Sequence, residues 1–232
     1  MQSQYQRLAK GSLFLPHNYA CILPMSTKEK ILAAALKCFN TDGMVNVRLQ
    51  HIADEAGISV GNLAYHFPNK QAIVLGLYKK LETEQVELLR EFRTVPLFDN
   101  IDQLLEAVFQ HQQTYRFFYL DTLEVMRAYP NVHAEYQKHV ETEVQQWLQI
   151  LKFNIARGVM RPEPRTGFHT GLALQLWATS THHMSQEVVR SATLPDLKDY
   201  KTAIWNLLIP LFTKLGHQEY EQMLQSPYDL FY

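Results

Sequence analysis

The sequence predicts an all-α protein with a small N-terminal head and a larger helical body. Apolar residues recur at helical spacing in one segment after another, and Gly and Pro punctuate the breaks between these segments. No segment shows the two-residue alternation that is typical of a half-buried strand. With 232 residues, 47% of them hydrophobic, the chain can bury one large core or a head and a body.

Residues 1–24 differ from the rest of the chain. They contain no acidic residue, two prolines and no helical period, and Met25-Ser26-Thr27 then opens a clear helix with Ser26 or Thr27 as N-cap. We expect 1–24 to be an N-terminal extension that precedes the natural start. The alternative is an arm that contacts DNA through Arg7 and Lys10.

Four helices are predicted in and just after the head, which we expect to span 25–72. Gly43 and Gly57 end the first two, Phe67-Pro68 halts the third, and Asn69 caps the fourth. The expected ranges are 28–40, 47–55, 60–66 and 69–92. The second domain is expected to span 73–232 and to sense an effector and dimerise.

Five more helices are predicted in this body. Tyr129-Pro130-Asn131, Gly158 through Gly167, and Leu194-Pro195-Asp196 mark breaks between them. The expected ranges are 100–117, 119–129, 132–157, 167–189 and 197–215. Pro210 cannot donate a backbone hydrogen bond, so the last helix is expected to kink near its middle.

The segment from Arg48 to Lys70 predicts a helix-turn-helix. Ala53 is small where a second helix must cross closely, and Gly57 can adopt the left-handed conformation that ends the first helix. Ser59 then caps the second helix. The small core between the two helices is expected to consist of Ile52, Ala56, Ile58 and Leu63.

The outward residues of the second helix are short or can form hydrogen bonds. They are Val60, Gly61, Asn62, Tyr65 and His66. A helix that enters the major groove, about 12 Å wide, needs such side chains for base edges and free N–H groups for phosphate. An alternative is that Tyr65 and Phe67 belong to the core and that Lys70 is simply a solvated helix end.

This segment resembles the TetR family of bacterial regulators. The shared pattern comprises Gly43, Ile52-Ala53, Ala56-Gly57-Ile58-Ser59, Gly61, Leu63, Tyr65-His66-Phe67 and Asn69-Lys70, in register and without gaps. The resemblance covers about 25–72, roughly a fifth of the chain. It implies that the helix contacts DNA and that Lys70 contacts a phosphate. The candidate DNA-binding residues are Arg48, Gln50, Ser59, Val60, Gly61, Asn62, Tyr65, His66 and Lys70.

Two departures from the family pattern leave the operator sequence open. Asn62 and Ala64 replace the usual Thr and Tyr. Val47-Arg48 stands where a Thr or Ser cap is usual, so Asn46 is the candidate cap and Arg48 is expected to reach the DNA backbone electrostatically.

The resemblance also implies a homodimer in which the last two long helices pair with their copies in a four-helix interface. The apolar stripes on these helices agree with this. The candidate interface residues are Leu172, Leu176, Ile204, Leu208, Leu211, Phe212 and Leu215. The alternative is that the stripes face only the core of the monomer.

Aromatic residues concentrate between the head and the expected interface, where this family usually encloses an effector. Aromatic and Met side chains with a few polar groups suit a hydrophobic or planar small molecule. The candidate ligand-binding residues are Phe109, Tyr115, Phe118, Met126, Trp147, Leu151, Trp177 and His183. The alternative is that these side chains are ordinary core.

Composition and spacing argue against several other classes. Cys21 and Cys38 supply neither a disulfide framework nor a zinc site, and His182-His183 point about 100° apart on a helix, so we expect no metal or cofactor. No Gly-rich phosphate loop or catalytic motif is present, and no apolar run approaches the ~20 residues of a membrane helix. We expect a cytoplasmic protein that is not an enzyme.

The function predicted from these features is sequence-specific regulation of transcription. Residues 25–80 carry seven basic and four acidic side chains, whereas 81–232 carry 13 basic and 19 acidic ones, so only the head suits double-stranded operator DNA. An unidentified effector would tilt helix 69–92 and release a repressor. The alternatives are a ligand-independent architectural or protein-docking module on DNA, and a small-molecule enzyme with an incidental helix-turn-helix.

Overall fold

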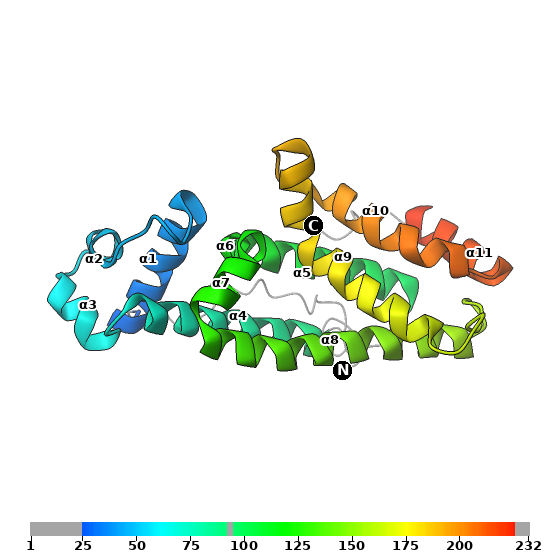
Figure 1. Ribbon diagram of the computed structural model, residues 1–232. Helices are drawn as coiled ribbons and strands as arrows, with labels where there is room; N and C mark the ends of the chain where they lie inside the picture. Colours follow the sequence, from blue (N-terminus) through cyan, green and yellow to red (C-terminus); the bar gives the residue numbers. More distant parts are fainter. Residues whose placement is uncertain (1–24, 92–94, 226–232) are drawn as a thin grey trace, which may run out of the picture.

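The computed structural model describes residues 25–91 and 95–225, and every regular element within these ranges is helical (Figure 1). Residues 1–24, with the expected extension and its possible DNA-binding arm, lie outside the described residues. The elements are α1 (Thr27–Asp42), α2 (Leu49–Ala56), α3 (Val60–His66), α4 (Lys70–Glu91), α5 (Phe98–Thr114), α6 (Arg116–Leu120), α7 (Thr122–Ala128), α8 (Pro130–Ala156), α9 (Phe168–Ser191), α10 (Leu197–Leu208), a 3-10 turn (Ile209–Leu211) and α11 (Lys214–Gln225).

The molecule is elongated, with α1, α2 and α3 at one end and α11 at the other (Figure 1). Helix α4 leaves the head and runs beside α8 along the body. Helix α9 packs on α8, and its C-terminal end projects from the body before the chain turns into α10. The head and the distant end of the body are therefore joined by long, continuous helices.

Two apolar clusters form the core. The first begins in the head, with Phe39 and Leu63, and continues through Tyr78 of α4 to Phe118 of α6. The second fills the far half of the body between α5, α8, α9, α10 and α11. The expected domain boundary at residue 72 falls in the first turn of α4, and the first cluster continues across it. That division of the chain stays a prediction.

The predicted helices of the head match the structure within a few residues, and those of the body differ at two places. The first difference lies around Tyr115 and Asp121, where the backbone leaves helical geometry and separates α5, α6 and α7. Three consecutive aromatic side chains, Phe117, Phe118 and Tyr119, are buried there. All three lie within the short helix α6, and the breaks on either side of it let α1, α5, α7 and α9 cover this helix from several sides.

The second difference concerns Pro210. Instead of kinking one helix, it lies in a 3-10 turn after α10 has ended at Leu208, and α11 follows as a helix that the sequence did not predict. The Thr213 side chain accepts a hydrogen bond from the Gly216 N–H (3.2 Å), as an N-terminal cap does. The Thr213 N–H donates to the Val159 carbonyl (3.0 Å), so the turn is fastened to the chain that follows α8.

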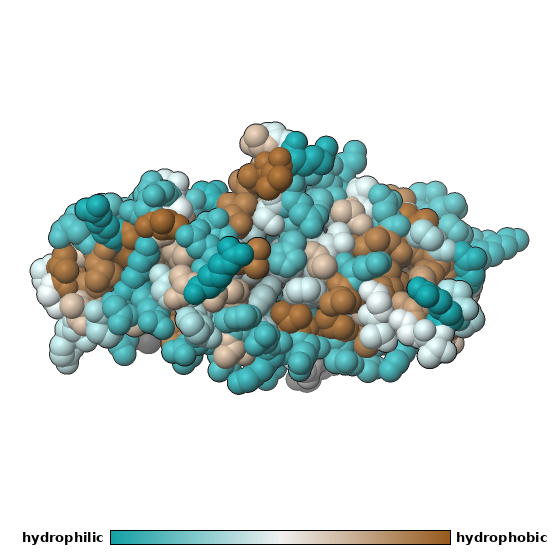
Figure 2. Space-filling view, viewed as in Figure 1, coloured by the Kyte–Doolittle hydropathy of each residue, from teal (hydrophilic) through white to brown (hydrophobic). Residues whose placement is uncertain are grey.

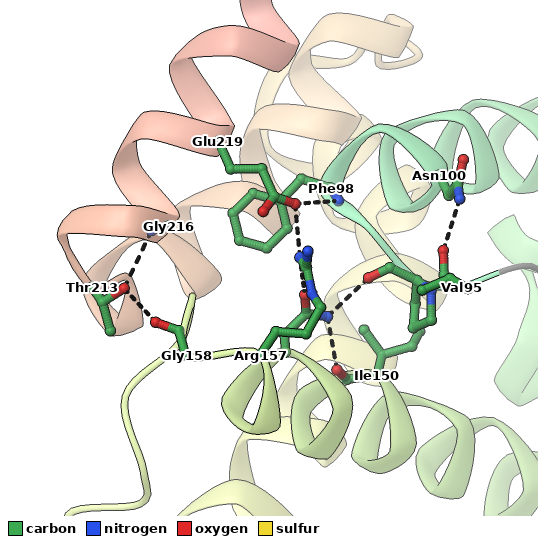
Figure 3. Close-up of polar contacts among 11 residues, drawn as sticks. Val95, Phe98, Asn100, Ile150, Arg157, Gly158, Thr213, Gly216 and Glu219 are labelled. Carbon is green, nitrogen blue, oxygen red and sulfur yellow. Dashed lines mark hydrogen bonds and ion pairs between the residues drawn. The ribbon is translucent and has the colours of Figure 1, made fainter.

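A polar cluster locks α11 to the ends of α5 and α8 (Figure 3). The Glu219 carboxylate accepts from the Arg157 guanidinium at 2.7 Å and from the Phe98 N–H at 3.2 Å. The Asn154 amide donates to the Pro96 carbonyl at 3.0 Å and accepts from Arg157 at 2.8 Å. Pro96 and the first residue of α5, Phe98, are therefore anchored at the end of the body farthest from the head.

Five of the seven predicted dimer-interface residues are buried inside this chain, so their contact with a partner stays a prediction. The second apolar cluster of the same chain buries them, because α9 and α10 turn their apolar stripes toward α5 and α8. These residues are Leu172, Leu176, Ile204, Leu208 and Phe212. Leu211 is half-buried and Leu215 is exposed.

Candidate nucleic-acid interface and interior cavity

The turn between α2 and α3 has the geometry of a helix-turn-helix. Gly57 adopts the left-handed conformation (φ 67°, ψ 36°), and the Ile58 N–H returns to the Ala53 carbonyl at 3.0 Å. The Ser59 hydroxyl accepts from the Asn62 N–H at 3.1 Å, which confirms the predicted cap. Leu63 is fully buried, so α3 is held with one face inward.

The opposite face of α3 is free of contacts with the body. The Tyr65 side chain is 84% exposed, although large aromatic side chains usually bury most of their surface. Asn62 and Gly61 are exposed beside it, and the His66 ring lies edge-on to Tyr65 with 5.1 Å between the ring centroids. Val60 is half-buried against the first cluster. This face therefore offers an amide, a phenol and an imidazole to a partner.

Helix α2 adds Arg48 and Gln50, both exposed. Arg48 occupies the N-cap position, and its N–H donates to His51 Nδ1 at 3.4 Å. The suggested cap Asn46 is wrong. Its amide donates to the Asp42 carbonyl at 2.9 Å and finishes α1, because α2 begins only at Leu49.

Lys70 has main-chain partners inside the head. Its ammonium group donates to the carbonyls of Met44 and Val45 and lies over the Phe39 ring, 5.7 Å from the centroid. Burial lowers the pKa of Lys70. The side chain therefore braces the α1–α2 loop against the start of α4, while its contact with phosphate stays a prediction.

A small, partly open cavity of about 40 Å³ lies between α4, α5, α8 and α9. This volume holds a few water molecules. The lining residues are Gln85, Leu89, Leu104, Leu105, Val108, Glu143, Gln146, Trp147, Ile150 and Ser180.

Of the eight predicted ligand-binding residues, only Trp147 lines this cavity. Trp177 does not line the cavity, but its indole N–H donates to the lining residue Glu143 at 3.1 Å. His183 packs against Tyr200, with 5.8 Å between the ring centroids. The remaining five are core side chains that do not line the cavity, because the aromatic residues of α5 to α8 pack mainly on one another: Phe109, Tyr115, Phe118, Met126 and Leu151.

The polar residues of the cavity were missed by sequence reasoning. The Glu143 carboxylate accepts from Gln85 at 2.6 Å and from Trp177 at 3.1 Å, and burial raises its pKa to about 7. His139 lies 3.1 Å from the Gln85 oxygen, and burial lowers its pKa to about 4. A signal was present in the sequence. Tyr136, Val140, Glu143 and Trp147 follow one another at spacings of three or four residues, so the Glu143 carboxylate lies on the apolar face of α8.

Comparison with known proteins agrees with this geometry. Residues 31–77 match the model of the N-terminal domain described as "Bacterial regulatory proteins, tetR family". Residues 80–220 match a second model, described as "Bacterial transcriptional repressor". The chain belongs to the TetR family.

Relatives of this TetR-family chain are transcriptional regulators. It is 26% identical to the HTH-type transcriptional regulator RutR of Escherichia coli O157:H7 over 190 residues, 78% of this chain and 86% of RutR. A TetR-family regulator from Marinobacter aquaeolei VT8 superposes with a TM-score of 0.76 at 24% identity, covering 87% of this chain and 98% of that one. SmeT, the repressor of a Stenotrophomonas maltophilia multidrug efflux pump, has been solved with triclosan; that complex superposes with a TM-score of 0.59 at 19% identity, covering 82% and 93%.

Two further observations concern the described residues of this TetR-family chain. None of their helices is long and apolar enough to cross a membrane. Within 25–91 and 95–225, no three His, Cys, Asp or Glu side chains gather in a way that could hold a metal ion. His182 and His183 turn to different neighbours, the Trp177 ring and the Tyr200 ring.

Proposed function

We propose that this chain is a one-component repressor that acts in the cytoplasm, binds operator DNA as a homodimer and leaves it when an effector enters the body. The exposed polar face of α3, held by the capped turn at Gly57 and Ser59, is the observation that carries the proposal. Such a helix can place side chains on base edges while its N-terminus approaches a phosphate. The family match over both domains and the triclosan complex of SmeT support an effector-responsive role.

Helix α4 is the expected link between effector and DNA. It starts in the head at Lys70 and carries Gln85 and Leu89 into the cavity wall. Pro96, five residues after the end of α4, is hydrogen-bonded to α8. A ligand that widens the cavity would push against the α4 wall and so move the head, which lies at the other end of this helix.

A second contact joins the head to the body at Asn40, near the end of α1. The Asn40 carbonyl accepts from the Arg116 guanidinium at 2.9 Å, and its side chain accepts from the Phe117 N–H at 3.0 Å. Its amide donates to the Thr114 carbonyl at 2.9 Å. Movement of the α5–α6 junction would therefore reach the head through α1 as well as through α4.

Dimerisation needs a surface that differs from the buried stripe. One face of α9, with residues spaced three or four apart, is not buried by this chain: Leu174, Ala178, His182, Ser185 and Val189. Val189 is 88% exposed, and Figure 2 shows hydrophobic side chains on the projecting end of α9. A two-fold partner on this face would place a second α3 to contact the other half of the operator.

Negative charges introduced on this face of α9 are expected to dissociate the dimer. Leu174→Asp/Val189→Asp buries two unpaired carboxylates in the proposed interface, so sedimentation should shift from twice 27.0 kDa to the monomer. The control Leu123→Asp changes an equally apolar side chain on α7, 68% exposed, and should remain dimeric. A Leu174→Asp/Val189→Asp protein that is still dimeric would place the interface elsewhere.

Fluorescence anisotropy on the DNA upstream of the chain's own gene tests the proposed function. We expect nanomolar to micromolar binding that weakens by about 10³-fold or more between 50 and 200 mM salt, because Lys and Arg contacts release counterions from phosphates. Failure to bind any duplex, from a folded dimer, would contradict DNA recognition altogether.

A second candidate function is a DNA-bound docking module without an effector, and the small volume of the cavity favours it. In the same titration, equal affinity for the upstream DNA and a random duplex would support this candidate over the repressor.

A further inference from the structure

The interior cavity contains one carboxylate in surroundings that carry no positive charge. Among the described residues, no Lys or Arg lies within ion-pair distance of Glu143, and its only basic neighbour is His139, 3.7 Å away. Neutral amide, hydroxyl, indole and apolar groups from four helices surround it: Gln85 of α4, Leu104, Leu105 and Val108 of α5, Gln146 and Trp147 of α8, and Trp177 and Ser180 of α9. Four buried tyrosines also interact with its charge, and burial raises the pKa of each, so they stay neutral: Tyr78 of α4, Tyr119 of α6, Tyr136 of α8 and Tyr200 of α10.

Hydrogen bonds hold this carboxylate in one orientation. The Gln85 amide N–H donates to Glu143 Oε1 at 2.6 Å, so the Gln85 oxygen must accept from His139 Nε2 at 3.1 Å. The Trp177 indole donates to Glu143 Oε2 at 3.1 Å. A carboxylate has about four acceptor positions, so roughly two remain after these bonds. Glu143 lines the cavity, and its side chain keeps 16% exposure.

A negative charge in such a site is unfavourable unless a cation accompanies it. Burial raises the pKa of Glu143 to about 7, whereas the hydrogen bonds from Trp177 and Gln85 act in the opposite direction. The neighbouring histidines do not supply the missing charge near neutral pH, because burial lowers the pKa of both His139 and His111.

The geometry points to Glu143 as the ligand-recognition group of this cavity and to a compact organic cation, with N–H donors on a planar apolar body, as the ligand class. The cation would pair with the carboxylate and use its free acceptor positions. Trp147 offers an aromatic surface, and Leu105 and Val108 offer an apolar wall. The inference deepens the proposed effector function and rests on it.

Other ligand charges fit this site less well. An anion would meet the Glu143 carboxylate with no Lys or Arg to balance it among the residues that line the cavity. A neutral amide could use the hydrogen-bond acceptors but would leave the charge unpaired. The charge of the ligand, rather than its shape, is therefore the property that should decide affinity.

Three probes of nearly equal shape test this inference by isothermal titration calorimetry: benzamidinium, benzamide and benzoate. Each is larger than the 40 Å³ cavity, so entry requires the displacement of α4 that the repressor mechanism uses. At pH 8 we expect benzamidinium to bind at least about tenfold more tightly than benzamide, and benzoate not to bind, because only the cation forms an ion pair with Glu143.

Glu143→Gln keeps the shape and the acceptor for Trp177 but removes the charge. We expect it to abolish the preference for benzamidinium over benzamide. The matched control is Glu141→Gln, which removes an exposed carboxylate two residues earlier on α8 and should leave the preference unchanged. Circular dichroism of both variants checks that they are folded.

The affinity of the wild-type protein for benzamidinium is also expected to depend on pH, a test that needs no variant. With a pKa of about 7 in the free protein, Glu143 is mostly ionised at pH 8 and mostly protonated at pH 6. Benzamidinium affinity should therefore fall about tenfold between pH 8 and pH 6. Because burial lowers the pKa of His139 to about 4, this neighbour of Glu143 stays neutral over the whole range.

Equal affinities for the three probes, tighter binding of benzoate, or absence of benzamidinium binding to the wild-type protein would each overturn the inference. An unchanged preference in Glu143→Gln would overturn it as well. Operator binding is measured on the same samples. If the wild-type protein binds its operator but does not distinguish the three probes by charge, the inference about Glu143 fails and the proposed regulatory function is unaffected. If the wild-type protein does not bind its operator, the proposed function itself fails.

Discussion

Replacing Asn62 and Tyr65 together by alanine is expected to weaken operator binding by about 100-fold or more, since a good base contact contributes about 1–3 kcal/mol. Both side chains are exposed on α3 and belong to neither apolar cluster. The variant should therefore unfold at the wild-type temperature. Fluorescence anisotropy at one fixed salt concentration measures the loss, and thermal unfolding followed by circular dichroism checks the fold.

The control for this variant is Asn206→Ala. Asn206 is exposed on α10, a helix of the body that lies away from the head (Figure 1), and its replacement should leave operator affinity unchanged. Undiminished affinity of a folded Asn62→Ala/Tyr65→Ala dimer would mean that α3 is not the DNA-contacting helix.

Gly216→Ala is expected to lower the free energy of unfolding by about 2–3 kcal/mol, a drop of roughly 4–12 °C in the midpoint. A Cβ at this position would overlap the Val159 carbonyl oxygen and lie 3.2 Å from Phe212 Cβ. The backbone oxygen cannot rotate away, so α11 would have to shift and strain the Arg157–Glu219 ion pair (Figure 3). Urea unfolding monitored by circular dichroism measures the change.

Gly171→Ala is the matched control, with an effect of the opposite sign. Gly171 lies in the first turn of α9, is exposed, and has no atom within 4 Å of a built Cβ. Alanine there should stabilise the protein by up to about 1 kcal/mol, because glycine is the poorer helix former. Stability of Gly216→Ala equal to that of the wild type would show that α11 is not seated against Val159.

The head could be predicted closely because its signals are local. Gly57 ends α2 in the left-handed conformation, and Ser59 caps α3 through a hydrogen bond to a residue three positions away. Such caps depend on a few neighbouring residues and very little on the rest of the fold. The exposure of Tyr65 followed from the same segment, since burial of Leu63 turns the other face outward.

The cavity was only partly predictable. The aromatic residues of the body stand out in the sequence, but of the eight predicted ligand-binding residues only Trp147 lines the cavity. Glu143 had a recognisable pattern, a carboxylate on the apolar face of α8. What could not be foreseen is its partners, since Gln85 is 58 residues away and Trp177 is 34 residues away in the sequence.

By itself, the sequence determined the fold class, the position of the helix-turn-helix and the family of this protein. Tertiary structure alone decided which surface remains for a partner and where the last helix lies. A stripe such as Ile204 and Leu208 shows that one face of a helix is buried, but its period is the same whether its own chain or a second copy covers it. Likewise, Pro210 in the sequence shows only that one helical hydrogen bond is lost, because proline has no backbone N–H. Whether the chain kinks or stops there depends on distant groups, here the Val159 carbonyl that accepts from Thr213 and the Arg157 side chain that binds Glu219.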